Sequence, residues 1–385
     1  SMIFDDKYID YKSKSKRELY ENLILFKLLS KPKLVSIGKY ILKICLFLKI
    51  PISVIIKNTI FKHFCGGENI NESIKIIQTL SKNNIKTILD YSVEGQKNEI
   101  GFQDVFNEIL RNIEISKKSS EIPFCVFKLT GIARFELLEK LNNKLVLSDN
   151  ESKELDSLKL KLNKICALAE KVNTPILIDA EESWIQDAID GLAEKLMSKF
   201  NIKKVIVYNT IQLYRKGRLE YIKKIHRSAK NENFKLGLKL VRGAYIEKER
   251  IRAKKNGYNC PIHNNKDNCD VEFNNATKYC IENIKDISVC FGTHNLKSTQ
   301  IAIELMKQNK IKNNDTRIYF SQLLGMCDTI SYSLSKFNYN VAKYVPYGPV
   351  KSVLPYLIRR AEENSSIGNQ TSEEIGRLKK AIKNY

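Results

Sequence analysis

Two adjacent arginines, Arg359 and Arg360, lie in the helical stretch "YVPYGPVKSVLPYLIRRAEEN", and Glu363 follows them closely. Adjacent guanidinium groups suit a carboxylate or a phosphate, because each planar fork can donate two hydrogen bonds to one anion. The stretch therefore predicts a helix that binds an anion. A simpler alternative is a surface ion pair between Arg359 and Glu363 at i,i+4 spacing.

Further polar residues follow short apolar runs along the chain. Glu181 and Glu182 could simply cap the next helix, and His294 could be a buried core histidine. Taken together, the set is rich in cations and predicts a site for an anionic ligand. We see no cluster with metal-ligand spacing and no Ser or Cys in an evident nucleophile setting, so hydride or proton chemistry on an organic cofactor fits better. The residues are Lys128, Asp179, Glu181, Glu182, Gln212, Lys239, Arg242, Tyr245, Thr293, His294, Asn295 and Tyr344.

Eight apolar, β-branched runs alternate with helical patterns and must position these residues. Such alternation indicates parallel strands joined by helices, and eight units predict a closed (β/α)8 TIM-type barrel with its chemistry at the carboxyl ends of the strands. The glycine-rich phosphate turn of an open doubly wound sheet is missing. The runs span residues 86–93, 124–130, 175–180, 204–209, 236–241, 288–293, 317–322 and 341–347.

The sequence predicts three parts. Residues 1–85 are expected to form an N-terminal helical extension, residues 86–366 the catalytic barrel, and residues 367–385 a polar C-terminal tail with a short surface helix. The most apolar early segment, "YILKICLFLKIPISVII", is interrupted by two lysines and a proline. It is too short to span a bilayer. An amphipathic helix that covers the barrel is the favoured interpretation, and membrane contact is the alternative.

The 385 residues carry a formal net charge of +22, spread over scattered lysines. This charge could favour an anionic membrane or nucleic acid, but no nucleic-acid-binding motif accompanies it. The nine cysteines are odd in number and lack framework spacing, as expected for a reducing compartment. Cys260, His263 and Cys269 lie close in sequence without a second pair of ligands, so no zinc site is predicted.

The motifs "LVRGAYIEKER", "DAEE", "GTHN" and "YVPYGPVKSVLPYLIRRAEEN" together resemble the proline dehydrogenase family of flavoenzymes, also called proline oxidases. "CGGE" followed by "ILDYSVEG" is similar to the eukaryotic, mitochondrial branch. The resemblance covers about residues 64–366. It implies a distorted (β/α)8 barrel that binds FAD non-covalently and oxidises L-proline to Δ1-pyrroline-5-carboxylate, the first step of proline catabolism. Hydride would pass from C5 of proline to flavin N5, and electrons would go on to a membrane quinone.

The resemblance also implies roles for individual residues. Arg359, Arg360 and Lys128 would bind the proline carboxylate, with Asp179 paired to Lys128 and Glu363 holding the arginines. Tyr344, Leu323 and Tyr245 would pack around the proline ring. Lys239, where bacterial relatives carry arginine, would lie near N5. The expected cofactor-binding residues are Asp179, Gln212, Lys239, Val241, Gly243, Thr293, His294 and Glu363.

The resemblance further implies a mitochondrial enzyme on the matrix side of the inner membrane, with a peripheral membrane contact. The targeting peptide is expected to be absent from this sequence, and neither a nucleic acid nor a metal is expected as a partner. No strong general base is evident, so solvent is expected to take the ammonium proton of the substrate.

Three alternatives remain open at this stage. A hydroxyproline dehydrogenase would share the fold and the cofactor, although the bulk of Tyr344 opposes a 4-hydroxyl group and favours proline. A Schiff-base lyase would use Lys128 as its nucleophile, but this requires a depressed pKa, and nearby carboxylates would raise it. A non-catalytic scaffold barrel would have no need of the polar residues at the strand ends.

Overall fold

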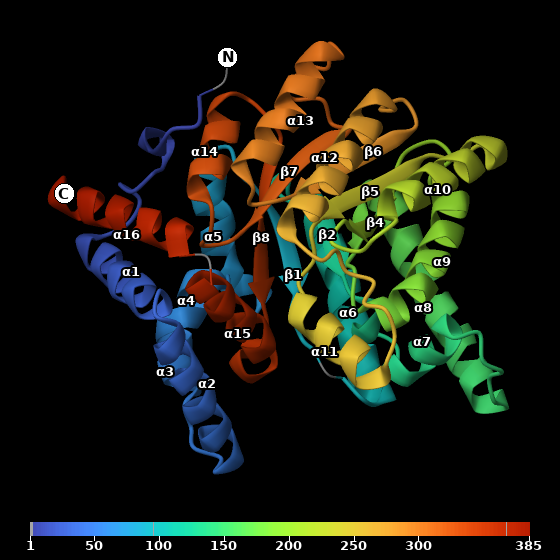
Figure 1. Ribbon diagram of the computed structural model, residues 1–385, viewed down its shortest axis with the longest axis horizontal. Coiled ribbons are helices and arrows are strands. Elements are labelled where there is room, and N and C mark those ends of the chain that lie inside the picture. The colour runs from blue at the N-terminus through green and yellow to red at the C-terminus, as the bar shows by residue number, and fades with distance from the viewer. Residues whose placement is uncertain (1–2, 95, 367) are drawn as a thin grey trace.

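A computed structural model describes residues 3–94, 96–366 and 368–385 of the chain. Eight parallel strands close into a barrel in the order β1 to β8 and are surrounded by helices (Figure 1). The predicted (β/α)8 barrel is therefore confirmed. The strands are β1 Lys86–Tyr91, β2 Phe124–Phe127, β3 Ile176–Ile178, β4 Val207–Gln212, β5 Leu236–Val241, β6 Ile287–Gly292, β7 Ile318–Leu323 and β8 Val341–Tyr347.

Helices precede the barrel, connect its strands and follow it. Before β1 lie η1 Asp6–Tyr8, α1 Lys16–Leu29, α2 Pro32–Phe47, α3 Ser53–Ile56, η2 Lys57–Phe61, α4 Lys62–Phe64 and α5 Ile70–Lys82. Between the strands lie α6 Glu99–Ser116, η3 Leu129–Gly131, α7 Phe135–Asn142, α8 Asp149–Val172, α9 Ser183–Phe200, α10 Arg218–Glu232, α11 Ile246–Asn256, α12 Lys266–Glu282, α13 Leu296–Gln308 and α14 Asp328–Lys336. After β8 come α15 Val350–Ser366 and α16 Gly368–Lys383.

The strands are buried on both faces, which explains their continuous apolar character. Inside the barrel, Ile88, Phe124, Leu177 and Tyr208 belong to one packed cluster, and the rings of Phe124 and Tyr208 meet edge-on at 5.2 Å. A larger apolar cluster fills the space between the strands and the surrounding helices. The interior is thus a packed core rather than a pore, and it gives the strand ends a rigid base.

Strand β4 begins later than the sequence predicted. The run 204–209 was expected to form it, but the strand is Val207–Gln212. The buried Asn201 explains the shift, since its side-chain oxygen accepts hydrogen bonds from the amides of Ile206 and Val207 at 2.9 and 2.8 Å. This local pairing keeps residues 201–206 in a loop. Gln212 consequently ends the strand instead of following it.

The "CGGE" segment joins the N-terminal extension to the end of β8. The Gly66 amide donates to the Pro346 carbonyl at 2.8 Å, and the Gly348 amide donates to the Gly67 carbonyl at 3.1 Å. A Cβ atom at Gly66 would lie 2.6 Å from the Val345 side chain, so the close approach requires glycine. The segment therefore fixes the point at which the chain leaves the barrel for α15.

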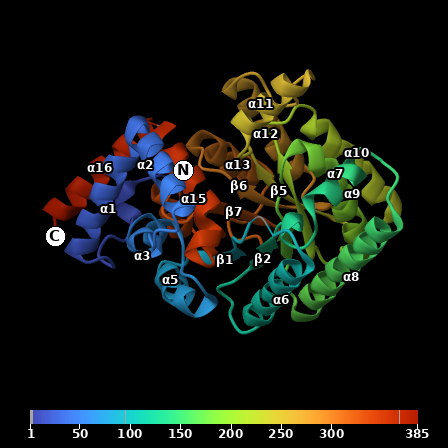
Figure 2. The ribbon, with the colours of Figure 1, turned by 90° about the horizontal axis from the view of Figure 1, so that it is seen from below.

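Both ends of the chain pack on the same side of the barrel, as the view from below shows (Figure 2). Leu19, Leu23 and Phe26 of α1 form an apolar cluster with Leu378 of α16. The C-terminal segment is thus helical over Gly368–Lys383 and packs against α1. The division of the chain into parts that end at residues 85 and 366 stays a prediction. Residues 1 and 2 of the N-terminal part and residue 367 of the C-terminal part lie outside the described residues.

Close packing between strands makes a prediction about Gly237 of β5. A Cβ atom there would meet the backbone oxygen of Val207 and, at 2.9 Å, the ring of Tyr208. We expect Gly237→Ala to lower the free energy of unfolding by about 1–3 kcal/mol, because neither neighbour can move without disturbing the sheet. Urea unfolding followed by circular dichroism measures the change.

Gly191 in α9 is the matched control, because nothing lies within 4 Å of a Cβ atom added there. Gly191→Ala should raise the free energy of unfolding by up to about 1 kcal/mol through helix propensity. Equal effects of the two substitutions would contradict the packing argument.

Candidate active site

A cavity of about 800 Å³ lies at the carboxyl ends of the strands, within the size range of ligand pockets. All fourteen residues to which the resemblance assigns a role line this cavity, whereas Glu181 and Glu182, which the strand pattern also placed in the site, do not. Parallel strands present their carboxyl ends at one rim, so residues far apart in sequence meet there. The residues are Lys128, Asp179, Gln212, Lys239, Val241, Gly243, Tyr245, Thr293, His294, Leu323, Tyr344, Arg359, Arg360 and Glu363. Their individual roles stay predictions.

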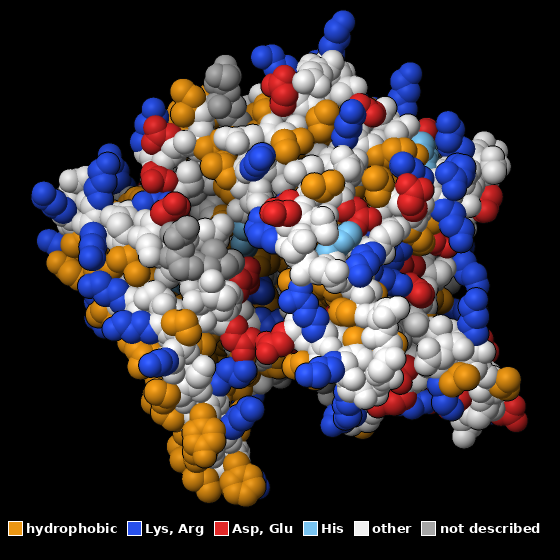
Figure 3. Space-filling model, viewed as in Figure 1, with side chains coloured by type: hydrophobic (Ala, Val, Ile, Leu, Met, Phe, Trp, Pro, Cys, Tyr) orange, Lys and Arg blue, Asp and Glu red, His pale blue; other side chains and the backbone are white. Residues whose placement is uncertain are grey.

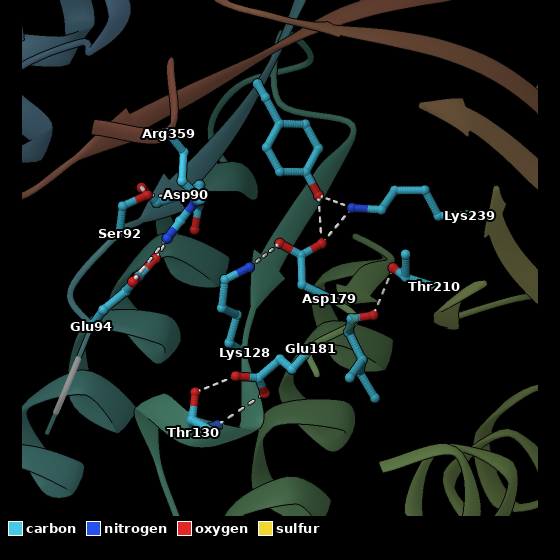
Figure 4. Close-up of polar contacts among 12 residues, drawn as sticks. Asp90, Ser92, Glu94, Lys128, Thr130, Asp179, Glu181, Thr210, Lys239 and Arg359 are labelled. Carbon is cyan, nitrogen blue, oxygen red and sulfur yellow. Dashed lines mark hydrogen bonds and ion pairs between the residues drawn. The ribbon is translucent and has the colours of Figure 1, made fainter. Parts of the chain in front are cut away.

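The centre of the site is the carboxylate of Asp179, directly after β3 (Figure 4). It accepts hydrogen bonds from the Lys128 ammonium at 3.1 Å, from the Lys239 ammonium, and from the Tyr344 hydroxyl at 3.1 Å. Lys239 also donates to the Tyr344 oxygen. The predicted pair between Lys128 and Asp179 is thus present, and Asp179 contacts Lys239 and Tyr344 as well.

Burial and pairing act in opposite directions on these groups. Burial alone would raise the pKa of Asp179, but the ammonium groups of Lys128 and Lys239 outweigh it and hold the pKa far below its usual range. Burial would lower the pKa of Lys128, yet the charge of Asp179 overcomes it and raises this pKa well above its usual value. Lys128 therefore stays charged. This contradicts the Schiff-base alternative, which needs a neutral amine.

Arg359 of α15 pairs with Glu94, which lies on the loop after β1 (Figure 4). The guanidinium donates from both terminal nitrogens, with Nη1 at 3.3 Å from one Glu94 oxygen. The alternative of an i,i+4 pair between Arg359 and Glu363 is therefore wrong. Glu94 can accept hydrogen bonds from both terminal nitrogens of Arg359, whereas Glu363, one turn further along α15, pairs with Arg360.

Arg360 is the partner of Glu363. Its Nε atom lies 3.0 Å from a Glu363 oxygen at i,i+3 spacing, and its guanidinium carbon lies 4.8 Å from the centre of the Tyr356 ring. Arg360 is buried, whereas Glu363 is half-buried. The expectation that Glu363 holds the arginines thus applies to Arg360 alone.

Two carboxyl groups that line the cavity, Asp90 and Glu94, are absent from the predicted site. The quoted motif "ILDYSVEG" contains both, directly at and after the end of β1, so the barrel pattern offered a signal for them. Asp90 is 7% exposed, and within the described residues its carboxylate accepts one side-chain hydrogen bond, from the Ser92 hydroxyl at 2.8 Å. Burial raises its pKa to about 6, although the Lys128 charge opposes the shift.

Glu181 and Glu182 do not cap the following helix with their side chains. The helix begins at Ser183, and Glu182 precedes it without a capping hydrogen bond. Glu181 instead accepts hydrogen bonds from the hydroxyl and the amide of Thr130, while Glu182 pairs with Lys248. Burial raises the pKa of Glu181 to about 7. The capping alternative is therefore wrong, and Glu181 links the loops after β2 and β3.

His294 has a defined tautomer. Its Nε2 atom accepts a hydrogen bond from the Leu323 amide at 2.9 Å, so the proton of the neutral ring lies on Nδ1. Burial lowers the pKa of His294 to about 3, helped by the charges of Lys343 and Arg360. The ring is therefore neutral at physiological pH. Thr293 beside it accepts a hydrogen bond from Arg242 at 3.0 Å.

The guanidinium of Arg242 already has a carboxylate partner and further hydrogen bonds within the protein, so it is not free to bind an anionic ligand. Arg242 donates to Asp270 and Ser298, both at 2.8 Å, and its guanidinium stacks on the Phe273 ring. Next to it, Gly243 has a φ of 142°, and a Cβ atom there would lie 2.5 Å from the Tyr214 ring. Glycine is therefore required at this part of the cavity wall.

The other predicted residues complete the wall. Gln212 and Tyr344 are buried, and Leu323 is half-buried. Burial raises the pKa of Tyr245 to about 12, so its hydroxyl is neutral, and the Arg359 guanidinium lies 5.9 Å from the centre of its ring. His263, which also lines the cavity, pairs with Glu272. Within the described residues, no three His, Cys, Asp or Glu side chains are grouped closely enough to hold a metal ion.

Comparison with known families and proteins agrees with this geometry. A profile described as "Proline dehydrogenase" matches residues 73–373. The chain belongs to the proline dehydrogenase family. It is 32% identical over 419 residues to proline dehydrogenase 1, mitochondrial, of Dictyostelium discoideum, covering 97% of this chain and 73% of that protein. It is 31% identical over 372 residues to the mitochondrial proline dehydrogenase 2 of Arabidopsis thaliana, with 86% and 78% covered.

Solved structures support the fold. The proline utilization A protein (PutA) of Bdellovibrio bacteriovorus, inactivated by N-propargylglycine, matches with a TM-score of 0.72 at 22% identity. The match covers 80% of this chain but only 33% of that protein. The chain therefore spans about a third of PutA, and the likeness shows the barrel fold.

The buried Asp90 leads to a prediction about stability and pH. Its pKa of about 6 exceeds the ordinary 3.8, so the folded protein binds this proton more tightly than the unfolded chain. The free energy of unfolding should therefore fall as pH rises from about 4 to about 6, and the cost should persist above that. Asp90→Asn should stabilise the protein by about 1–3 kcal/mol at pH 8 and by almost nothing at pH 4.

Denaturant unfolding of wild type and variant at the two pH values gives the difference. The groups that set the Asp90 pKa besides burial are Lys128, Asp179, Ser92 and Lys239, and the substitution leaves all of them in place. Asp104→Asn, on the exposed face of α6, is the control and should show no pH-dependent gain. A gain for Asp90→Asn that is the same at both pH values would refute the assignment.

Proposed function

We propose that this chain oxidises L-proline to Δ1-pyrroline-5-carboxylate with non-covalently bound FAD, the first step of proline catabolism. The observation that carries the proposal is the placement of Lys128, Arg359 and Arg360 in the wall of one cavity, beside the buried pair of Asp179 and Tyr344. Three fixed cations suit the carboxylate of an amino acid. Membership in the proline dehydrogenase family supports the choice of proline.

The cavity fits a flavin by its size and by its donors. Its volume of about 800 Å³ is larger than proline needs, and Gly243 leaves part of the wall free of a side chain. Gln212, Lys239, Val241, Gly243, Thr293, His294, Glu363 and Asp179 are the residues that would hold the cofactor. Once bound, the flavin would supply the hydride acceptor N5 and pass the electrons to a membrane quinone.

The residues of the chain would bind and orient the substrate. Lys128 and Arg360 would donate hydrogen bonds to the proline carboxylate, and Arg359 would join them when Glu94 shares or releases it. Tyr344, Leu323 and Tyr245 would pack on the ring and keep water out. Positioning would then supply most of the catalysis, because a fixed carboxylate determines where C5 lies.

The protein would work on the matrix side of the inner mitochondrial membrane, where a quinone acceptor is within reach. The names of the relatives from Dictyostelium and Arabidopsis, both mitochondrial, support this location. Hydroxyproline is the second candidate substrate. The Tyr344 side chain opposes it, because Lys239 and Asp179 hold its hydroxyl in place and leave the ring little freedom to retreat from a 4-hydroxyl group.

An absorbance spectrum under anaerobic conditions tests the function. We expect a flavin band near ~450 nm that bleaches on addition of L-proline. A band that bleaches with hydroxyproline but not with proline would identify hydroxyproline as the substrate instead. A protein that stays colourless when FAD is added would exclude the cofactor and with it the proposal.

Arg360 provides a sharper test of the carboxylate site. Arg360→Met keeps the length of the side chain and removes its charge, so the KM for proline should rise about 10- to 100-fold, as expected for a charged hydrogen bond. The flavin band should remain. Arg317→Met removes an exposed arginine that pairs with Asp315, away from the cavity, and should leave KM unchanged. Equal KM values for Arg360→Met and wild type would remove Arg360 from the substrate site.

A further inference from the structure

The segment from residue 22 to residue 67 contains no Asp or Glu, although 43 of the 385 residues of the chain are acidic. The same segment contains eight lysines, at positions 27, 31, 33, 39, 43, 49, 57 and 62. It is therefore purely basic over 46 residues. Three of these lysines, at positions 39, 57 and 62, pair with glutamates outside the segment. The other five form no ion pair with any described residue, and their charge attracts anions and repels other basic surfaces, including a second copy of this chain.

Within this segment, α2, α3 and the turn between them form a projecting hairpin, residues 32–56 (Figure 1). Helix α2 is apolar, yet none of its residues and none of α3 is buried. Val35 and Leu42, half-buried on one side of α2, pack against the apolar cluster that contains Leu354 and Leu357 of α15. One side of the hairpin is thus held by the enzyme, and the rest faces solvent.

The free side of α2 carries an apolar stripe at helical spacing, formed by Ile37, Ile41 and Ile44 and continued by Leu48 directly after the helix. The tip is more exposed still. Phe47 has 85% of its surface exposed, and Val54 and Ile55 have 69% and 65%. Apolar side chains cover this projecting tip in the space-filling view, with basic side chains beside them (Figure 3). Such an exposed apolar patch marks a binding surface.

Apolar side chains bordered by lysines match the interface of a bilayer that contains anionic phospholipids. The apolar groups enter the boundary between headgroups and acyl chains, while each lysine near the surface contributes about 1 kcal/mol of attraction. A spanning segment does not fit, since no described helix is long and apolar enough to cross a membrane. A nucleic acid would use the lysines but not the apolar tip.

We propose that the tip of the hairpin, around Phe47, Val54 and Ile55, inserts into the interfacial region of an anionic bilayer and docks the enzyme there. The proposal goes beyond the proposed oxidation of proline, because docking requires neither flavin nor substrate. It assigns the membrane contact to one surface of the chain.

Vesicle flotation with the full chain, without added proline, tests the docking. We expect the protein to float with vesicles of phosphatidylcholine and phosphatidylglycerol, to stay largely behind with phosphatidylcholine alone, and to be released by salt. Phe47→Glu should lower the bound fraction at least tenfold at a fixed lipid concentration. The residue is exposed, so thermal unfolding should match wild type and show that the variant folds.

Val146→Glu is the matched control. Val146 is 94% exposed on the loop between α7 and α8, so it has a similar exposure away from the hairpin. This variant should bind vesicles as wild type does. Lys43→Gln combined with Lys49→Gln should weaken binding to anionic vesicles and reduce its salt dependence.

Three results would overturn the proposal. The first is that the wild-type protein fails to float with anionic vesicles at low salt. The second is that Phe47→Glu and wild type float equally. The third is that light scattering finds a wild-type dimer that Phe47→Glu converts to a monomer. The last result would assign the surface to self-association. Turnover of proline by wild type is measured separately, so a failure of the proposed oxidation stays distinguishable from a failure of docking.

Discussion

The carboxylate of Asp179 binds two ammonium groups in a part of the barrel where a single buried charge would be costly. Its contacts bring together Lys128 after β2, Lys239 of β5 and Tyr344 of β8, so the interaction spans the mouth of the barrel. Each of these side chains keeps its hydrogen bond to Asp179 only while the strands that carry the residues stay in place. The geometry of the site and the closure of the barrel therefore depend on the same hydrogen bonds.

The cations of the site have their own carboxylates before any ligand arrives. Asp179 pairs with Lys128, Glu94 pairs with Arg359, and Glu363 pairs with Arg360. Partners of this kind offset part of the cost of holding several positive charges in one cavity. An incoming anion must then compete with these carboxylates, which lowers its affinity but keeps the side chains oriented. Asp90 differs, since among the described residues no cation donates a hydrogen bond to its carboxylate, and its proton is held more tightly instead.

The repeating strand and helix pattern was sufficient to predict the barrel and the polar residues at the ends of its strands, because both depend on periodicity along the chain. Val241, Gly243 and Leu323 were expected in the site only because the sequence resembles a known family. The start of β4 was not predictable in this way, since it is set by hydrogen bonds from Asn201. The partner of Arg359 was also missed. Spacing along a helix suggested Glu363, but the choice of Glu94 depends on how a loop from the opposite end of the sequence folds over α15. Long-range pairing of this kind leaves no local pattern.

Helix α15 packs against the hairpin, and it also carries Arg359 and Arg360, which line the cavity. Lys39 of α2 pairs with Glu362, adjacent to Glu363. Any ligand that shifts α15 through the hairpin would also shift the guanidinium groups, and thermodynamic linkage requires the effect to be reciprocal. If contact with a bilayer changes the affinity for an amino acid, the amino acid must change the affinity for the bilayer by the same factor. The occupancy of the site would then help to decide what fraction of the enzyme is bound to the bilayer.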